Sequence, residues 1–170
     1  YRRPGAYSLE PDTSLDPGNS NNAGLEFISP PTSVDTMLTD LNKVVKWAKR
    51  YGCYTNKSTG LHMNVSIPDF NIDKLDYIKL ALLMGDEHIL EAFKRLGNTY
   101  CKPAMVKAKN SLANASPEQV VKYLQQVRKG LAFETSKAIH SGITDKYTSI
   151  NTKDGYVEFR SPGDDWLNMD

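Results

Sequence analysis

Residues 58–67, STGLHMNVSI, alternate between apolar and polar side chains, and this alternation restricts the possible folds of the chain more than any other feature. Because successive side chains of a β-strand point to opposite faces, the pattern predicts a strand with one apolar and one polar face. The apolar positions are Leu61, Met63, Val65 and Ile67, and the polar positions are His62, Asn64 and Ser66. An imidazole, an amide and a hydroxyl in a row are either solvated surface or part of a site.

Two further segments, GLEFIS (24–29) and YVEFRS (156–161), divide their side chains in the same way. Their polar positions, together with one on the preceding strand of the final hairpin, are Glu26, Glu158, Arg160 and Asn151. If all these strands share one sheet, its apolar face must pack on helices, and the polar faces combine into one concave wall.

Helical patterns separate the predicted strands. Ser33 is placed to cap a helix that runs to about Gly52. Two further helices are expected, one from about Asp73 to Met84 and one over DEHILEAFKRL, residues 86–96. Residues 97–115 are less regular, and SPEQ (116–119) is typical of a capping box that begins a long helix. Asp154 and Gly155 predict the turn of a C-terminal hairpin, with positive backbone angles. We therefore predict one α+β domain over residues 1–170, with an antiparallel or mixed sheet and helices on one face.

Composition excludes several classes of protein. The 170 residues are 39% hydrophobic and 24% charged, which fits a globular domain, and a net charge of +1 gives no field that would recruit nucleic acid or an anionic membrane. No apolar run is long enough to span a membrane, and no signal peptide opens the chain. Cys53 and Cys101 suggest neither a disulfide framework nor a zinc site. We expect a cytoplasmic protein, and a fragment of a longer one because the first residue is not Met.

The polar residues of the predicted wall suit two kinds of ligand. Two carboxylates, a histidine and an amide suit a divalent cation such as magnesium or manganese, and an arginine suits phosphate or carboxylate. Any one of these residues alone is most simply solvated surface, but their occurrence on matching faces of three strands favours a site. A basic segment, residues 94–109, is either a lid over bound phosphates or a solvated connector. Its cations are Lys94, Arg95, Lys102, Lys107 and Lys109.

These motifs resemble a known group of enzymes. GLHMNVS is similar to the G-x-H-x-H-x-S strand of the glutamine synthetase superfamily, and YVEFRSPGD is similar to its later E-x-R-x-P-D strand. More closely, the order DTSL, GLEFISPP, GLHMNV and VEFR resembles the amidoligase family of carboxylate–amine ligases of bacteria and their phages. The resemblance runs from about Tyr7 to Trp166.

The resemblance implies a glutamine-synthetase-like catalytic domain that uses ATP and Mg²⁺ (or Mn²⁺) to join a carboxylate to an amine through an acyl phosphate. The implied substrates are small molecules or peptides, and homo-oligomers are known among superfamily relatives. The implied metal ligands are Glu26, Glu158 and His62, and the implied catalytic residues are His62 and Arg160. The implied nucleotide or substrate contacts are Asn64, Ser66, Asn151 and Arg160, with Asp12 and Ser14 near the rim of the site.

Two departures from the family pattern keep other functions open. The family's opening Glu-x-Glu strand is not found ahead of the other motifs, where the one early glutamate is Glu10, and Asn64 stands where the family usually has a second His. One alternative is therefore a catalytically impaired binding or structural module. Another is a metal-dependent phosphoesterase that uses the same carboxylates to activate water.

Overall fold

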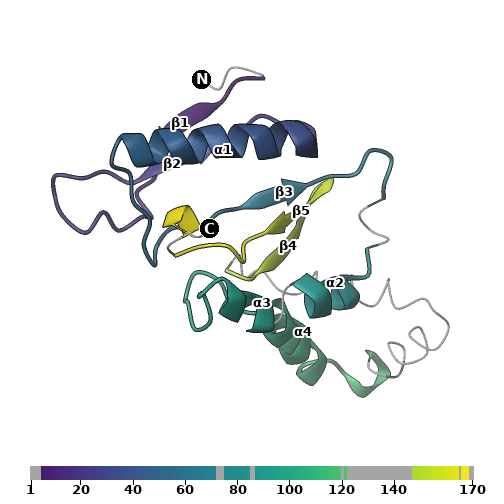
Figure 1. Cartoon of the computed structure of the whole chain (residues 1–170). Helices are drawn as coiled ribbons and strands as arrows, with labels where there is room; N and C mark the ends of the chain where they lie inside the picture. Colours follow the sequence, from purple (N-terminus) through teal and green to yellow (C-terminus); the bar gives the residue numbers. More distant parts are fainter. Residues whose placement is uncertain are drawn as a thin grey trace. The chain divides into compact units, whose positions relative to one another are not determined.

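The computed structural model describes residues 5–71, 75–84, 87–119, 121, 147–164 and 166–168. Contacts divide the chain into two compact units (Figure 1): the first is Tyr1–Thr59 with Asp165–Asp170, and the second is Gly60–Asp164. The predicted α+β class is confirmed. The described strands nevertheless form two antiparallel sheets, so the expectation of one shared sheet is wrong.

In the first unit, strands β1 (Ser8–Pro11) and β2 (Leu25–Ile28) pair with each other, and Glu10 lies opposite Glu26. The turn-rich tract between them folds back on itself, and the Asp12 amide donates to the Gly24 carbonyl at 2.9 Å. This hydrogen bond closes the loop and brings β2 beside β1, the strand that precedes it in the sequence. It explains why the strand that carries Glu26 does not join the sheet of the second unit.

Helix α1 (Val34–Arg50) follows in the first unit and confirms the predicted helix. The Ser33 side chain caps it by accepting a hydrogen bond from the Thr36 amide at 3.3 Å. Gly52 follows the helix with a φ of 71°, a conformation that glycine adopts without strain.

The sheet of the second unit contains β3 (Met63–Val65), β4 (Ile150–Lys153) and β5 (Tyr156–Phe159), with β5 in the centre. The turn between β4 and β5 lies where the sequence predicts it. Gly155 has a φ of 77°, whereas Asp154 is not among the described residues with positive φ, so only one of the two expected positive angles occurs.

Helices α2 (Tyr77–Met84), α3 (Glu87–Ala92) and α4 (Ala104–Ala113) lie on one side of this sheet (Figure 1). The first two lie within the two helices predicted from about Asp73 to Met84 and over residues 86–96. Helix α4 lies where the sequence shows no regular pattern, so that expectation is wrong. The Ala104 amide at the start of α4 donates to the Ser149 hydroxyl at 2.9 Å, a contact distant in sequence that a local pattern does not reveal.

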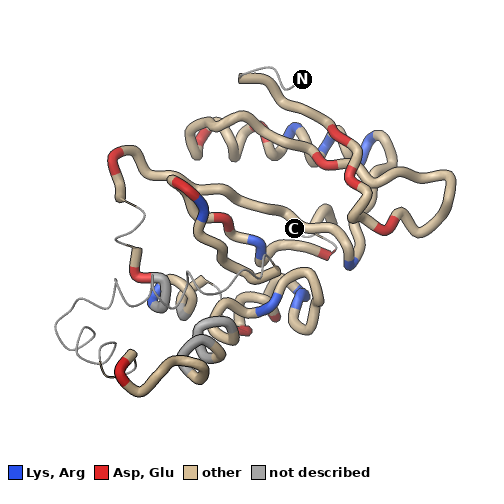
Figure 2. The backbone as a smooth tube through the Cα atoms, turned by 180° about the vertical axis from the view of Figure 1, so that it is seen from behind, with Lys and Arg blue, Asp and Glu red and all other residues tan. Residues whose placement is uncertain are grey.

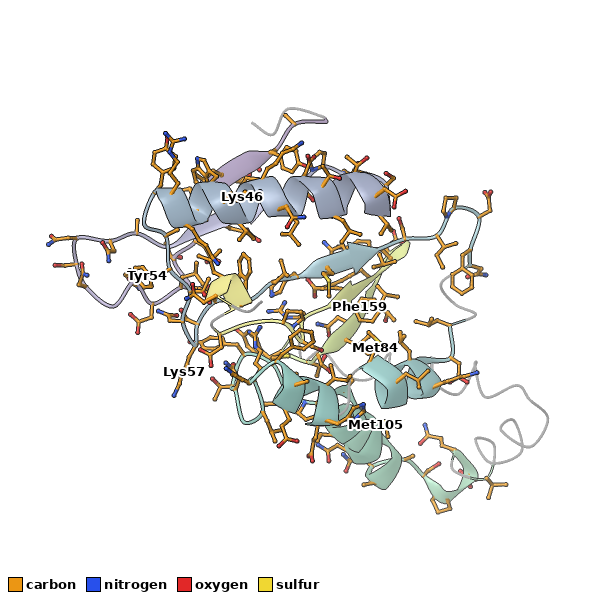
Figure 3. All side chains as sticks on the ribbon, in the orientation of Figure 1. Lys46, Tyr54, Lys57, Met84, Met105 and Phe159 are labelled. Carbon is orange, nitrogen blue, oxygen red and sulfur yellow. The ribbon has the colours of Figure 1, made fainter. Side chains whose placement is uncertain are left out.

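The core of the second unit lies between the helices and strands β4 and β5. Buried Ala81, Ala104, Ile150 and Val157 form its centre. Phe159 and Met105 pack against these residues and lie on the helical side of the sheet (Figure 3).

The predicted apolar face of β3 is not anchored in this core. Met63, Val65 and Ile67 are 41%, 45% and 61% exposed, and Leu61 is partly buried. Strand β3 lies at the edge of the sheet, and the core residues come from β4, β5 and the helices, which explains why this part of the prediction is wrong.

The capping box predicted in SPEQ is confirmed. The Ser116 amide donates to Gln119 Oε1 at 2.7 Å, and the Gln119 amide donates to the Ser116 hydroxyl at 3.3 Å. Apart from Val121, the long helix predicted after it lies outside the described residues. Within the described ranges, no helix is long and apolar enough to cross a membrane.

Helix α3 ends in a Schellman turn that fixes the residues after it. The Arg95 amide donates to the Leu90 carbonyl at 2.7 Å, and the Lys94 amide donates to the Glu91 carbonyl at 2.9 Å. Lys94 takes the left-handed conformation, with a φ of 54°, at the position where such turns usually have glycine.

Lys94→Gly is therefore expected to stabilise the protein by about 0.5–1 kcal/mol, because it removes a strained β-carbon at a small cost in unfolded-state entropy. Chemical denaturation would measure the change. Lys79→Gly, on an exposed position inside α2, is the matched control and should destabilise by about 0.5–1 kcal/mol. A Lys94→Gly protein less stable than the parent would contradict the role assigned to this turn.

Candidate functional site

Glu158 lies at the centre of the polar face of the three-stranded sheet. It stands in β5 directly opposite Asn64 of β3 and Asn151 of β4. Residues opposite one another in antiparallel strands share a face, so these three side chains form one row. Alternation along the strands places further polar side chains on the same face. We call this set the polar wall, which consists of His62, Asn64, Asn151, Lys153, Glu158 and Arg160.

The Glu158 side chain is surrounded by donors and cations. Asn151 Nδ2 donates to Oε2 at 3.2 Å, and Arg160 Nη1 lies 3.5 Å from the same oxygen. Lys153 Nζ is 3.9 Å from Oε2, and His62 Nδ1 is 3.9 Å from Oε1. Glu158 is 9% exposed, so these contacts act where water screens charge less than at the surface. Figure 2 marks acidic and basic positions close together along these strands.

Asn151 orients the central carboxylate from the protein side. Its Oδ1 accepts a hydrogen bond of 2.6 Å from the Thr148 hydroxyl, which leaves Nδ2 directed at Glu158. Asn151 is 5% exposed, and both ends of its amide have protein partners. The predicted contact of Asn151 with nucleotide or substrate stays a prediction.

Lys153 belongs to the wall although the sequence analysis did not select it. It follows Asn151 by two positions in β4, so the alternation rule placed it on the same face. The signal was therefore present in the sequence. Its neighbours Asp154 and Gly155 form the turn, and a residue beside a turn is as easily part of the loop as of the strand.

Asn64, in the central row of the wall, is exposed. The remaining predicted site residues are not part of the wall as defined, and Ser66 is exposed just after the end of β3. Glu26 belongs to the sheet of the first unit. Asp12 and Ser14 also belong to that unit, where Asp12 Oδ1 accepts from the amide and the hydroxyl of Ser14 at 2.8 and 2.7 Å.

The charge of the wall suits an anion. One carboxylate, Glu158, stands beside two cations, Lys153 and Arg160, with His62 as a third basic group. Arg160 Nε is buried and has no hydrogen-bond partner among the described residues, so the protein leaves this donor unsatisfied. Paired donors of this kind recognise phosphate or carboxylate oxygens.

Fewer residues of the wall suit a divalent metal ion than suit an anion. The described part of the chain contains no group of three or more His, Cys, Asp or Glu side chains arranged to hold a metal ion. Magnesium is usually bound by one or two carboxylates together with water and substrate phosphates. Glu158 Oε1, which faces His62, fits a metal ion whose other ligands come from phosphate or water.

Arg95 and Cys101 lie buried behind one end of the wall. Arg95 is 1% exposed, and its Nη1 donates to the Arg160 and Pro162 carbonyls at 3.2 and 2.6 Å. The Cys101 thiol also donates to the Arg160 carbonyl, at 3.2 Å. Burial lowers the pKa of the Arg95 guanidinium from its usual value. Both interpretations of the basic segment, lid and solvated connector, are therefore wrong for Arg95.

The two cysteines are expected to differ sharply in their rates of alkylation. Cys101 is fully buried and burial raises the pKa of its thiol, whereas Cys53 is exposed. Because the thiolate is the reactive form, iodoacetamide should modify Cys53 first and leave Cys101 intact until the protein unfolds. Peptide mass spectrometry with and without denaturant would measure both sites. Equal native-state labelling would contradict the burial of Cys101.

Comparison with known proteins places this chain in a family. A family model described as "Putative amidoligase enzyme" matches residues 2–162, a range that includes every residue of the polar wall. No curated protein and no solved structure matched the chain. Since the family match covers nearly the whole sequence, the chain belongs to the amidoligase family.

Proposed function

We propose that this protein is an ATP-dependent ligase, with a glutamine-synthetase-like catalytic fold, that joins a small-molecule or peptide carboxylate to an amine. The observation that carries the proposal is the polar wall, in which one oriented carboxylate has two cations and a histidine within 3.9 Å. Membership of the amidoligase family supports the formation of an amide bond.

In the proposed reaction, a substrate carboxylate oxygen attacks the γ-phosphorus of ATP, the bond to the ADP oxygen breaks, and an acyl phosphate forms. The amine nitrogen then attacks the acyl carbon, inorganic phosphate leaves, and the amine loses a proton. Such phosphoryl transfer needs positioned charge more than covalent chemistry from the protein. Bound Mg²⁺, the proposed cofactor, would neutralise charge on the phosphates.

The wall residues provide separate parts of this chemistry. Arg160 and Lys153 bind the oxygens of the transferring phosphoryl group, where negative charge accumulates. His62 accepts the proton that the amine releases, and Glu158 Oε1, 3.9 Å from His62 Nδ1, would hold the magnesium ion. Thr148 and Asn151 hold Glu158 in place for this role.

The proposal is tested by measuring phosphate release from ATP with a panel of carboxylates and amines. A ligase releases phosphate faster only when its carboxylate is present, and forms amide only when its amine is also present. Calorimetric titration with a non-hydrolysable ATP analogue, with and without Mg²⁺, provides a substrate-independent measurement. Hydrolysis of phosphate esters without an amine would instead favour a phosphoesterase. Failure of a folded sample to bind the analogue would favour a binding module.

A further inference from the structure

The fully buried Arg95 guanidinium packs directly on the backbone of two glycines. Gly60 and Gly163 face each other as an antiparallel bridge just beyond β3 and β5. A β-carbon on Gly163 would lie 1.8 Å from Arg95 Nη1, and one on Gly60 would lie 3.0 Å from it. The space that these missing side chains leave is the space that the guanidinium occupies.

This guanidinium connects the two strands that carry the basic end of the wall. Its Nη1 donates to the carbonyls of Arg160 and Pro162, and the Pro162 carbonyl also accepts from the Leu61 amide at 3.0 Å. Arg160 and Leu61 are respectively a wall residue and the neighbour of the wall residue His62. The imidazole of His62 lies close by, with Nε2 3.1 Å from the β-carbon position of Gly60.

The Arg95 side chain is itself held in one place. Its backbone is the last residue of the Schellman turn after α3, and its partner in that turn, Leu90, is fully buried. A buried cation is costly unless its donors are satisfied, and Arg95 Nε has no partner within the described residues. An apolar side chain of similar volume would fill the same space without that cost, so the charge and its two carbonyl contacts call for a role.

We propose that Arg95 is a positioning residue of the polar wall: by binding the carbonyls of Arg160 and Pro162, it fixes the ends of β3 and β5 and so directs the Arg160 and His62 side chains. Its effect on ligand binding rests on the function proposed above, whereas its effect on these strand ends does not. Lysine keeps the charge but lacks the planar guanidinium that fills the space beside Gly60 and Gly163, so it should not hold both carbonyls in the same positions.

The test compares Arg95→Lys with the adjacent control Lys94→Asn, which removes an exposed cation at a position where asparagine tolerates the left-handed backbone. Amide hydrogen exchange is measured along the chain, together with affinity for the magnesium complex of a non-hydrolysable ATP analogue. In Arg95→Lys we expect faster exchange confined to the amides of residues 60–62, 160, 161 and 163, with the central amides of β4 and β5 still protected. Lys94→Asn should leave both regions unchanged.

The affinity of Arg95→Lys should fall by about tenfold, since a charge-assisted hydrogen bond contributes on that scale. The same change in an Arg160→Gln background should cost much less, because Arg95 acts through Arg160. Additive losses, or exchange that rises uniformly with no change in the affinity of the folded protein, would overturn the proposal. If the parent protein binds no nucleotide, the proposed function fails. The exchange experiment still decides the role of Arg95, because faster exchange confined to the strand ends supports it and a uniform rise contradicts it.

Discussion

Gly163→Ala is expected to destabilise the second unit by about 3 kcal/mol, because overpacking and the loss of buried charged hydrogen bonds both contribute. The new β-carbon would lie 1.8, 2.3 and 2.7 Å from Nη1, Cζ and Nε of Arg95. Arg95 is 1% exposed and its backbone is fixed by the turn after α3, so the guanidinium has little room to move away. Chemical denaturation followed by circular dichroism would measure the loss.

A second variant separates this collision from other effects of alanine. Gly163 is not among the glycines with positive φ, so its backbone conformation is open to alanine. In an Arg95→Ala background, where the space is free, Gly163→Ala should cost little further stability. Equal losses in the two backgrounds would show that the guanidinium is not what excludes the side chain.

Glu158→Gln is expected to lower the affinity for nucleotide in the presence of Mg²⁺ and to raise it in the absence of metal. The magnesium-dependent affinity for an ATP analogue should fall by about tenfold or more, since a neutral amide is a poor ligand for this ion. The affinity measured without metal should rise by roughly two- to fivefold, because the wall loses its only carboxylate while Lys153 and Arg160 remain. Stability should fall only modestly, since Asn151 can still donate to the glutamine oxygen.

Calorimetric titrations at equal ionic strength, with Mg²⁺ or with a chelator, would measure both affinities. Glu91→Gln, which removes an exposed carboxylate from α3, is the matched control and should change neither value. A parallel fall under both conditions would mean that Glu158 supports the fold of the wall rather than a metal. An unchanged magnesium effect would remove Glu158 from the proposed metal ligands.

Several features followed from short-range patterns because their causes are local. Alternation placed Glu158 and Asn151 on one face, and the turn at Gly155 made them neighbours across a hairpin. Ser33 and the capping box at Ser116 were visible because a cap and its partners lie within one helical turn. Alternation also placed His62 and Asn64 correctly, although it did not reveal which strand they would pair with.

The remaining features depend on contacts between distant parts of the chain. Arg95 looked like one member of a solvated basic run, and only its approach to Gly60 and Gly163 explains its burial. The start of α4 depends on Ser149, far along the sequence. The choice of partner for β2 was set by closure of the preceding loop, which periodicity does not specify.

The central position of β5 has a consequence for the order of folding. The pairing of Asn151 with Glu158 closes a short hairpin, whereas the pairing of Asn64 with Glu158 must close a loop that contains most of the second unit. Long loops close at a greater entropic cost. The pairing of Asn151 with Glu158 is therefore expected to form early, and the pairing of Asn64 with Glu158 late. A partly folded chain would hold Glu158 beside Asn151 before His62 reaches its place in the wall. Ligand binding would therefore begin only when folding of the second unit is complete.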